Sequence, residues 1–291
     1  MNAQDMPLLV QTGWLQDRLG DQDLRVFDCT VRLEPAPGGV KLTSGRDAWT
    51  RAHVPGAGFL DLLGDLSDRT SRFNAMLPPA GQFAEALGAA GVGPGTRVVL
   101  YDDAGNMWAA RIWWMLRCFG FDAAGVLDGG WRRWTAEGRP VSDAPPAYPP
   151  ARFDARPRPG LMADKAEVLR SLGREDVLLV NALGPEIHSG AAAPYGRAGR
   201  IPGSVNVPAM SLLDPETGAY RPAADLRRAF DAVGALDGRK VVAYCGGGIA
   251  ACSDALALTA LGAGDVAVYD GSLTEWIADP DTPLETDVPA A

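Results

Sequence analysis

The feature that most constrains the fold is an internal duplication of the sequence. Three segments of the first half align with three segments of the second, in the same order and at a nearly constant offset. The matched pairs are 53–59 with 200–206, 89–120 with 232–262, and 126–134 with 268–276. Repetition of this kind predicts two copies of one structural unit. The alternative is that unrelated strand-helix patterns share a general likeness.

A proline-rich stretch separates the two copies. Residues 142–160 read SDAPPAYPPARFDARPRPG, and proline stiffens a chain and lacks the amide hydrogen that a sheet needs. The chain has 291 residues, which is enough for two domains of ordinary size. We therefore predict a first domain at 1–143, a linker at 144–160 and a second domain at 161–291.

Within each copy, short apolar runs alternate with longer helical patterns. The runs predicted as strands are 24–29, 97–101 and 123–127, then 177–181, 240–244 and 265–269. The segments predicted as helices are 82–90 and 107–119, then 223–233 and 249–261. Strands that alternate with helices form right-handed crossover units. Each copy should therefore be an α/β domain, a parallel sheet with helices on both faces.

The overall charge excludes some partners. The net charge is -9 and the isoelectric point about 4.8, whereas nucleic acids and anionic membranes attract positive surfaces. No apolar run approaches the ~18 residues of a membrane span. The N-terminus lacks the pattern of a signal peptide. These observations predict a cytoplasmic protein without a nucleic-acid or membrane partner.

The four cysteines do not suggest a disulfide scaffold or a zinc site. They are Cys29, Cys118, Cys245 and Cys252, and no CxxC pair occurs among them. With two histidines in the whole chain, ligands for zinc are scarce. We predict reduced thiols and no metal.

Cys245 differs from the other cysteines because glycines follow it. In VVAYCGGGIAACSDAL, a predicted strand ends at this cysteine and a predicted helix begins after Gly246, Gly247 and Gly248. Glycines allow the backbone to turn several amides inward, and such a nest before a helix N-terminus favours an anion. A sulfur held there should ionise more easily and become nucleophilic. The alternative is a buried cysteine at a strand end beside a simple glycine turn.

The residues around this loop exclude several reactions. A cysteine phosphatase needs an arginine six positions after the cysteine to hold phosphate, and Ala251 occupies that position. Neither histidine belongs to a motif that pairs with Cys245, and a GxxxxGK phosphate loop is absent. What remains is the transfer of a group that suits a neutral nest, and a sulfur atom carried as a persulfide fits.

Six motifs follow one another along the chain: HVPGAGFLDL, VVLYDDAGNMWAARIWWMLRCFG and LDGGWRRW, then RIPGSVNVP, YCGGGIAA and YDGSLTEW. In these motifs the chain as a whole resembles the tandem-domain rhodanese family, of the thiosulfate or 3-mercaptopyruvate sulfurtransferase type. The resemblance implies two rhodanese-like domains and a catalytic Cys245 in the second. It also implies an inactive first domain, because Asp102 stands in the frame of that cysteine. Substrate would then bind along the loop of Gly246, Gly247, Gly248, Ile249 and Ala250.

The loop nevertheless departs from both family types. The basic residues of the thiosulfate type are replaced by Gly246 and Gly247, and the serine and threonine of the mercaptopyruvate type by Gly247 and Ala250. Arg197 and Arg200 are the nearest candidates to bind an anionic donor, with His188 as a further contributor. The alternative is that both arginines are solvated surface charges.

We therefore expect a sulfurtransferase without metal or organic cofactor. Sulfane sulfur would pass from a small anionic donor to Cys245 and then to an acceptor such as cyanide, sulfite or a thiol. The internal duplication favours a monomer. Because the loop after Cys245 lacks the polar side chains of both family types, we call it the bare loop. It leaves a second interpretation open, a low-activity sulfur-carrier or protein-binding module.

Overall fold

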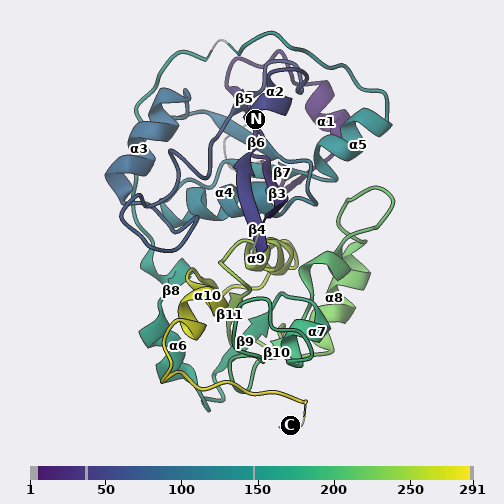
Figure 1. Ribbon diagram of the computed structural model, residues 1–291. Helices are drawn as coiled ribbons and strands as arrows, with labels where there is room; N and C mark the ends of the chain where they lie inside the picture. The colour runs from purple at the N-terminus through teal and green to yellow at the C-terminus, as the bar shows by residue number, and fades with distance from the viewer. Residues whose placement is uncertain (1–5, 37–38, 147, 289–291) are drawn as a thin grey trace. The chain divides into compact units, whose positions relative to one another are not determined.

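The computed structural model describes residues 6–36, 39–146 and 148–288 (Figure 1). Residues 1–5, 37–38 and 289–291 of the predicted domains and residue 147 of the predicted linker lie outside these ranges. The chain divides into two compact units. The first contains the chain up to Ser71, Leu77–Arg158 and Asp214–Tyr220, and the second contains Arg72–Met76, Pro159–Leu213 and the chain from Arg221 onward.

Each unit is built on a five-stranded sheet in which all paired strands are parallel. The first sheet has the order β1 (Leu9–Val10), β7 (Ala124–Leu127), β6 (Arg97–Tyr101), β2 (Leu24–Asp28), β5 (Gly58–Phe59). The second has the order β8 (Met162–Ala163), β12 (Val266–Tyr269), β11 (Lys240–Tyr244), β9 (Val177–Asn181), β10 (Val205–Asn206). The two orders are equivalent strand by strand. The predicted α/β class and duplication are therefore confirmed.

The aligned tyrosines end equivalent strands. Tyr101 of β6 pairs with Asp28 of β2, and Tyr244 of β11 pairs with Asn181 of β9. The residue after each tyrosine thus emerges at the carboxyl edge of its sheet, where ligands bind in open parallel sheets. Cys245 holds this position in the second unit.

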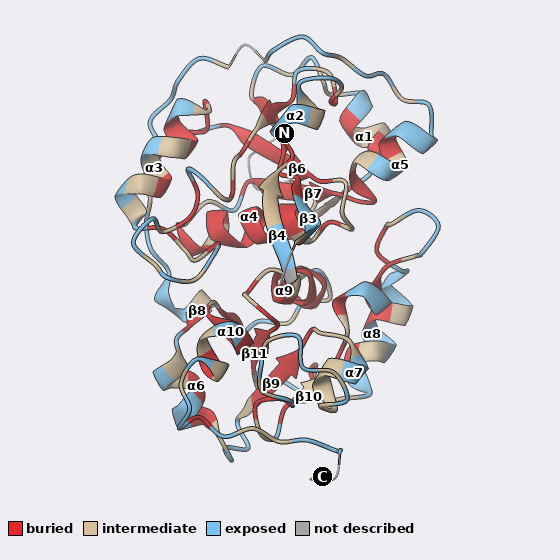
Figure 2. Cartoon of the chain, viewed as in Figure 1, coloured by how far each residue is buried: buried red, intermediate tan, exposed pale blue. Residues whose placement is uncertain are grey.

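Helices separate the strands in both units. The first unit has α1 (Thr12–Gln16), α2 (Arg46–Trp49), α3 (Ala80–Ala89), α4 (Met107–Cys118) and α5 (Gly130–Ala136). The second has α6 (Lys165–Ser171), α7 (Pro185–His188), α8 (Ala223–Asp231), α9 (Ala250–Ala260) and α10 (Ser272–Ile277), with 3₁₀ turns at Pro159–Leu161 and Ala209–Leu212. Figure 2 shows α4 and α9 as mostly buried, whereas α3, α6 and α8 each expose a face. None of the helices in the described ranges is long and apolar enough to cross a lipid bilayer.

Most of the proline-rich segment packs on the first unit. The Tyr148 hydroxyl accepts from the Val26 amide at 3.0 Å, and the Ala151 amide donates to the Gly88 carbonyl at 2.8 Å. Phe153 is buried and its ring lies edge-on to Phe83 at 5.6 Å. The chain accordingly passes from the first unit to the second between Arg158 and Pro159.

The first unit also contains elements that the sequence pattern did not reveal. Strands β3 (Val31–Ala36) and β4 (Gly39–Ser44) form a separate antiparallel pair. The segment Asp214–Tyr220 belongs to this unit although it comes from the second half of the sequence. The Asp128 carboxylate accepts from the Tyr220 amide at 2.8 Å. The aspartate of the DGG turn therefore anchors a distant loop.

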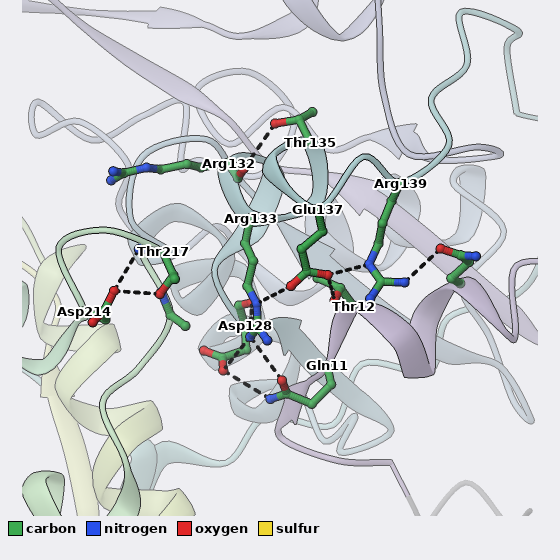
Figure 3. Close-up of polar contacts among 12 residues, drawn as sticks. Gln11, Thr12, Asp128, Arg132, Arg133, Thr135, Glu137, Arg139, Asp214 and Thr217 are labelled. Atoms are coloured by element: carbon green, nitrogen blue, oxygen red, sulfur yellow. Dashed lines mark hydrogen bonds and ion pairs between the residues drawn. The ribbon is translucent and has the colours of Figure 1, made fainter.

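A network of side chains joins residues near the start and the end of the predicted first domain (Figure 3). Asp128 accepts from Gln11 at 3.1 Å, and Arg133 donates to Gln11 at 3.1 Å. Glu137 accepts from Arg133 at 2.8 Å and from Arg139 at 2.7 Å. Burial opposes ionisation of Glu137, but hydrogen bonds from Thr12, Arg139 and Arg133 outweigh it and lower the pKa of Glu137 to about 2.

Candidate active site

The loop after β11 is held in place by Ser272, which lies in the motif YDGSLTEW. Cys245 is buried, and its amide donates to Ser272 Oγ at 3.0 Å. The Gly248 amide donates to the same oxygen at 3.1 Å, and Ser272 Oγ donates to the Tyr269 carbonyl at 2.7 Å. Ser272 has φ +49°, a left-handed conformation that costs a side chain about 1–2 kcal/mol. Sequence reasoning missed this residue, because DGS suggests only a turn.

The carbonyl groups of the loop are held as well. Leu273 N donates to the Cys245 carbonyl at 3.0 Å. The Gly246 carbonyl accepts from Thr274 N at 2.9 Å and from Thr274 Oγ1 at 2.7 Å. Cys252 Sγ donates to the Gly248 carbonyl at 3.1 Å, so this thiol braces the loop from α9. None of the four cysteines, all of which lie in the described ranges, forms a disulfide.

Three loop amides are not used by the protein. Within the described part of the chain, the amides of Gly246, Gly247 and Ile249 donate to no protein acceptor. Buried amides are normally paired, either within the protein or with a bound ligand or water. These three N–H groups are therefore available to an anion at the loop.

In the first unit, the equivalent loop binds a carboxylate. Asp102 follows Tyr101 as Cys245 follows Tyr244, and its carboxylate is buried. Its Oδ1 accepts from the amides of Ala104 and Asn106 at 2.8 and 3.0 Å. Its Oδ2 accepts from two further amides at 2.9 Å each, those of Trp108 and Ala109. Burial raises the pKa of Asp102 and the amides oppose that rise.

The two frames can be compared position by position. Counted from the aligned tyrosines, Gly247 and Ile249 stand where Ala104 and Asn106 stand in the first unit. The two amides that hold one oxygen of the Asp102 carboxylate thus correspond to two amides that have no protein acceptor beside Cys245. In the first unit these amides bind the Asp102 carboxylate. In the second unit the equivalent amides lie in the loop of the Cys245 thiol and have no protein acceptor in the described ranges.

A tyrosine that the sequence analysis did not identify lies over the loop. A Cβ atom placed on Gly246 would lie 2.6 Å from Tyr195 Cε1 and closer still to Cζ and the phenol oxygen. Burial, and secondarily the charge of Cys245, raise the pKa of Tyr195 to about 12. The signal in the sequence was indirect: Gly246 lacks the side chain that the family resemblance expects, so another group can fill that space.

The two predicted arginines contact the end of the chain. Arg197 donates to the carbonyls of Asp279 and Thr282 at 3.1 and 2.9 Å. Arg200 pairs with Glu285 and with Asp287, the latter at 2.8 Å. Their role in binding an anionic donor stays a prediction, and the contacts observed so far are structural.

His188 lies beside the arginine rather than in the cysteine loop. Its carbonyl accepts from Arg200 at 3.2 Å, and its Nδ1 lies 3.2 Å from Asn181 Nδ2. Burial and then the charge of Arg200 lower the pKa of His188. The described contacts thus connect His188 to the sheet edge at Asn181 and to Arg200.

Comparison with known proteins agrees with this architecture. The family model for the rhodanese-like domain matches residues 11–137 and 164–279. Thiosulfate sulfurtransferase of Bos taurus is 36% identical over 286 residues, which cover 94% of each chain. 3-Mercaptopyruvate sulfurtransferase of Homo sapiens is 38% identical over 281 residues, covering 92% of this chain and 91% of that protein.

Solved structures show the same likeness. The crystal structure of SseA from Escherichia coli, a 3-mercaptopyruvate sulfotransferase with the rhodanese fold, superposes with a TM-score of 0.78 at 27% identity. The match covers 92% of this chain and 99% of that one. A complex of the EanB Y353A variant with ergothioneine gives a TM-score of 0.82 at 25% identity, over 97% and 71% of the two chains.

Fold and site together define a duplicated α/β protein with a cysteine loop in the second copy alone. The matched family model spans both copies, and the curated relatives match over nearly their full length. The chain belongs to the tandem-domain rhodanese family of sulfurtransferases.

Proposed function

We propose that the protein transfers sulfane sulfur from a small anionic donor to a thiophilic acceptor through a persulfide on Cys245. The observation that carries the proposal is the cysteine loop, in which the amides of Gly246, Gly247 and Ile249 have no acceptor within the described ranges. Asp102 supports it, because the equivalent amides in the first unit surround a carboxylate.

The reaction has two halves. Cys245 Sγ, as thiolate, attacks the outer sulfur of the donor, and the bond that joined this sulfur to the rest of the donor breaks. The electron pair of that bond leaves with the first product: sulfite if the donor is thiosulfate, or the enolate of pyruvate if it is 3-mercaptopyruvate. The acceptor then attacks the outer sulfur of the persulfide, and the Cys245 thiolate leaves. Loop amides would stabilise the charge on sulfur in both steps.

Donor and acceptor are proposed by class. The matched relatives are named for thiosulfate and for 3-mercaptopyruvate, and both compounds are small anions. Cyanide, sulfite and thiols are the acceptors that suit attack on a persulfide. Residues 246–250 would line the substrate site, and the machinery calls for no metal or organic cofactor. We further propose a cytoplasmic monomer.

Mass spectrometry provides the test. After exposure to thiosulfate or 3-mercaptopyruvate, the peptide that contains Cys245 should gain one sulfur atom, and cyanide should remove it. Cys245→Ser should gain none, whereas Cys252→Ser should still be loaded. Equal turnover by the wild type and Cys245→Ala would contradict the proposal.

The bare loop favours one alternative, a sulfur carrier that is loaded by a partner protein. Loading of Cys245 from a persulfidated protein but from neither small donor would support this second function. Turnover with a small donor, at a rate that saturates with donor concentration, would support the enzyme.

A further inference from the structure

Tyr195 lies in the loop between α7 and β10, and its ring packs against the core of the second unit. The tip of the ring occupies the space where a side chain of residue 246 would begin. Gly247 has no heavy atom within 4 Å of an added Cβ. The crowding is therefore specific to the residue that directly follows the cysteine.

The phenol group of Tyr195 is available for a ligand. Across residues 6–36, 39–146 and 148–288, its oxygen makes no hydrogen bond to the protein. The side chain is only partly buried. Because burial and the nearby cysteine keep the pKa of Tyr195 at about 12, the phenol stays protonated at neutral pH and offers one O–H donor.

The two arginines that the sequence analysis proposed for anion binding already have protein partners. Arg200 is balanced by Glu285 and Asp287, and Arg197 donates to carbonyl groups of the turn at 279–282. The residues that follow Cys245 are glycines. Ser272 and Thr274 also contact the loop, but their hydroxyl groups are bonded to its backbone. Tyr195 is thus a polar side chain at the loop whose donor has no protein partner in the described ranges.

We propose that Tyr195 is a substrate-contacting residue whose phenol donates a hydrogen bond to an anionic oxygen of the sulfur donor. This inference rests on the sulfurtransferase function proposed above. It gives a reason for the bare loop, since Gly246 must lack a side chain for the phenol to reach its place. A neutral O–H would take over the binding task of a basic side chain at position 246.

The first test is Tyr195→Phe, which keeps the ring and removes the donor. A hydrogen bond to a charged group is worth about 10- to 100-fold in binding, so the KM for the donor should rise by about that factor. The KM for the acceptor should not change. The increase in the donor KM should also be the same at every pH between about 6 and 9, because the phenol does not titrate there. Tyr148→Phe, which removes a phenol from the first unit, is the matched control and should leave both KM values unchanged.

The second test compares Gly246 with a glycine of the same unit outside the cysteine loop. Gly246→Ala should displace the end of the Tyr195 side chain and raise the donor KM as Tyr195→Phe does. Gly264→Ala should have little effect, because an added Cβ there meets open space. In a Tyr195→Ala background, Gly246→Ala should cause no further loss, since residues in contact are not additive. Thermal unfolding of every variant separates misfolding from lost binding.

The outcomes distinguish this inference from the function on which it rests. If the wild type never forms a Cys245 persulfide, the proposed function fails. If the wild type forms it and Tyr195→Phe shows an unchanged donor KM, the role of Tyr195 is refuted. Equal effects of Gly246→Ala and Gly264→Ala on the donor KM would refute it too, even if Tyr195→Phe failed to fold.

Discussion

Removal of the Ser272 hydroxyl should loosen the cysteine loop. Ser272 Oγ accepts from the amides of Cys245 and Gly248 at 3.0 and 3.1 Å and donates to the Tyr269 carbonyl at 2.7 Å. All of these groups lie on buried residues. Each buried group left without its partner costs about 1–3 kcal/mol. We therefore expect Ser272→Ala to lower the free energy of unfolding of the second unit by about 2–5 kcal/mol.

The backbone of Ser272 adds a second, separable contribution. Its φ of +49° strains serine and alanine alike, whereas glycine adopts such angles freely. Gly130, at the equivalent position of the first unit, has φ +54°. Ser272→Gly should lose the same hydrogen bonds as Ser272→Ala but regain about 1 kcal/mol of strain. The difference between the two variants reports the relief of strain less the extra conformational entropy that glycine loses on folding.

Urea unfolding and persulfide formation together provide the assay. The stability change should appear in the transition of the second unit, and the rate of loading at Cys245 should fall with it. Thr274→Val is the control, because it removes one of the two donors to the Gly246 carbonyl and leaves Thr274 N in place. It should cost about 1 kcal/mol. The reasoning would be refuted if Ser272→Ala changed the free energy of unfolding by less than about 0.5 kcal/mol and left persulfide loading unchanged. Substitutions of surface residues without special contacts have effects of about that size.

Three further predictions concern contacts away from the loop. Asp102→Ala leaves four amides without an acceptor, so urea unfolding should show the first unit less stable by more than about 3 kcal/mol; a loss under about 1 kcal/mol would count against the anion nest. Because the pKa of Glu137 is lowered to about 2 from 4.5, its stabilisation is complete above about pH 4.5 and disappears as the pH falls toward 2. Glu137→Gln should flatten the pH dependence of stability in that window, and an unchanged slope would contradict the assignment. Arg200→Met leaves two carboxylates unpaired, and hydrogen exchange at the amide of Glu285, which donates to the Arg200 carbonyl, should become faster.

The framework of the fold could be read from the sequence because buried parallel strands are short apolar runs. The strands ending at Tyr101 and Tyr244 begin and end where the pattern places them. The hairpin of β3 and β4 could not be found in this way. Most residues of Val31–Ala36 are exposed and one is a proline, so the strand has no apolar face that a pattern could reveal.

The site was only partly accessible to sequence reasoning. Cys245 was recognised because its loop and its strand are local in sequence. Ser272 and Tyr195 meet that loop from segments far away along the chain. Ser272 lies in the motif YDGSLTEW, where DGS suggests only a turn, and Tyr195 lies in none of the motifs that the sequence analysis quoted. Arg200 was identified as a candidate because it precedes IPG, but sequence position cannot reveal that two carboxylates near the chain end surround it.

The duplication supplies a direct test of whether the cysteine loop accepts a negative charge. Cys245→Asp would place a carboxylate where the first unit carries Asp102, beside the amides of Gly247 and Ile249. The neutral isostere Cys245→Asn is the matched control, since it has the same shape without the charge. Both variants should be inactive in sulfur transfer.

Their relative stability decides the question. A buried carboxylate without donors costs several kcal/mol. Hydrogen bonds from amides oppose that cost, as they do for Asp102, although burial still raises its pKa. If the loop amides point at the sulfur position, the free energies of unfolding of Cys245→Asp and Cys245→Asn at neutral pH should differ by less than about 1 kcal/mol. If they point elsewhere, the aspartate variant should be less stable by about 3–5 kcal/mol. That larger difference would remove the physical basis for an ionised sulfur, and with it the proposed mechanism.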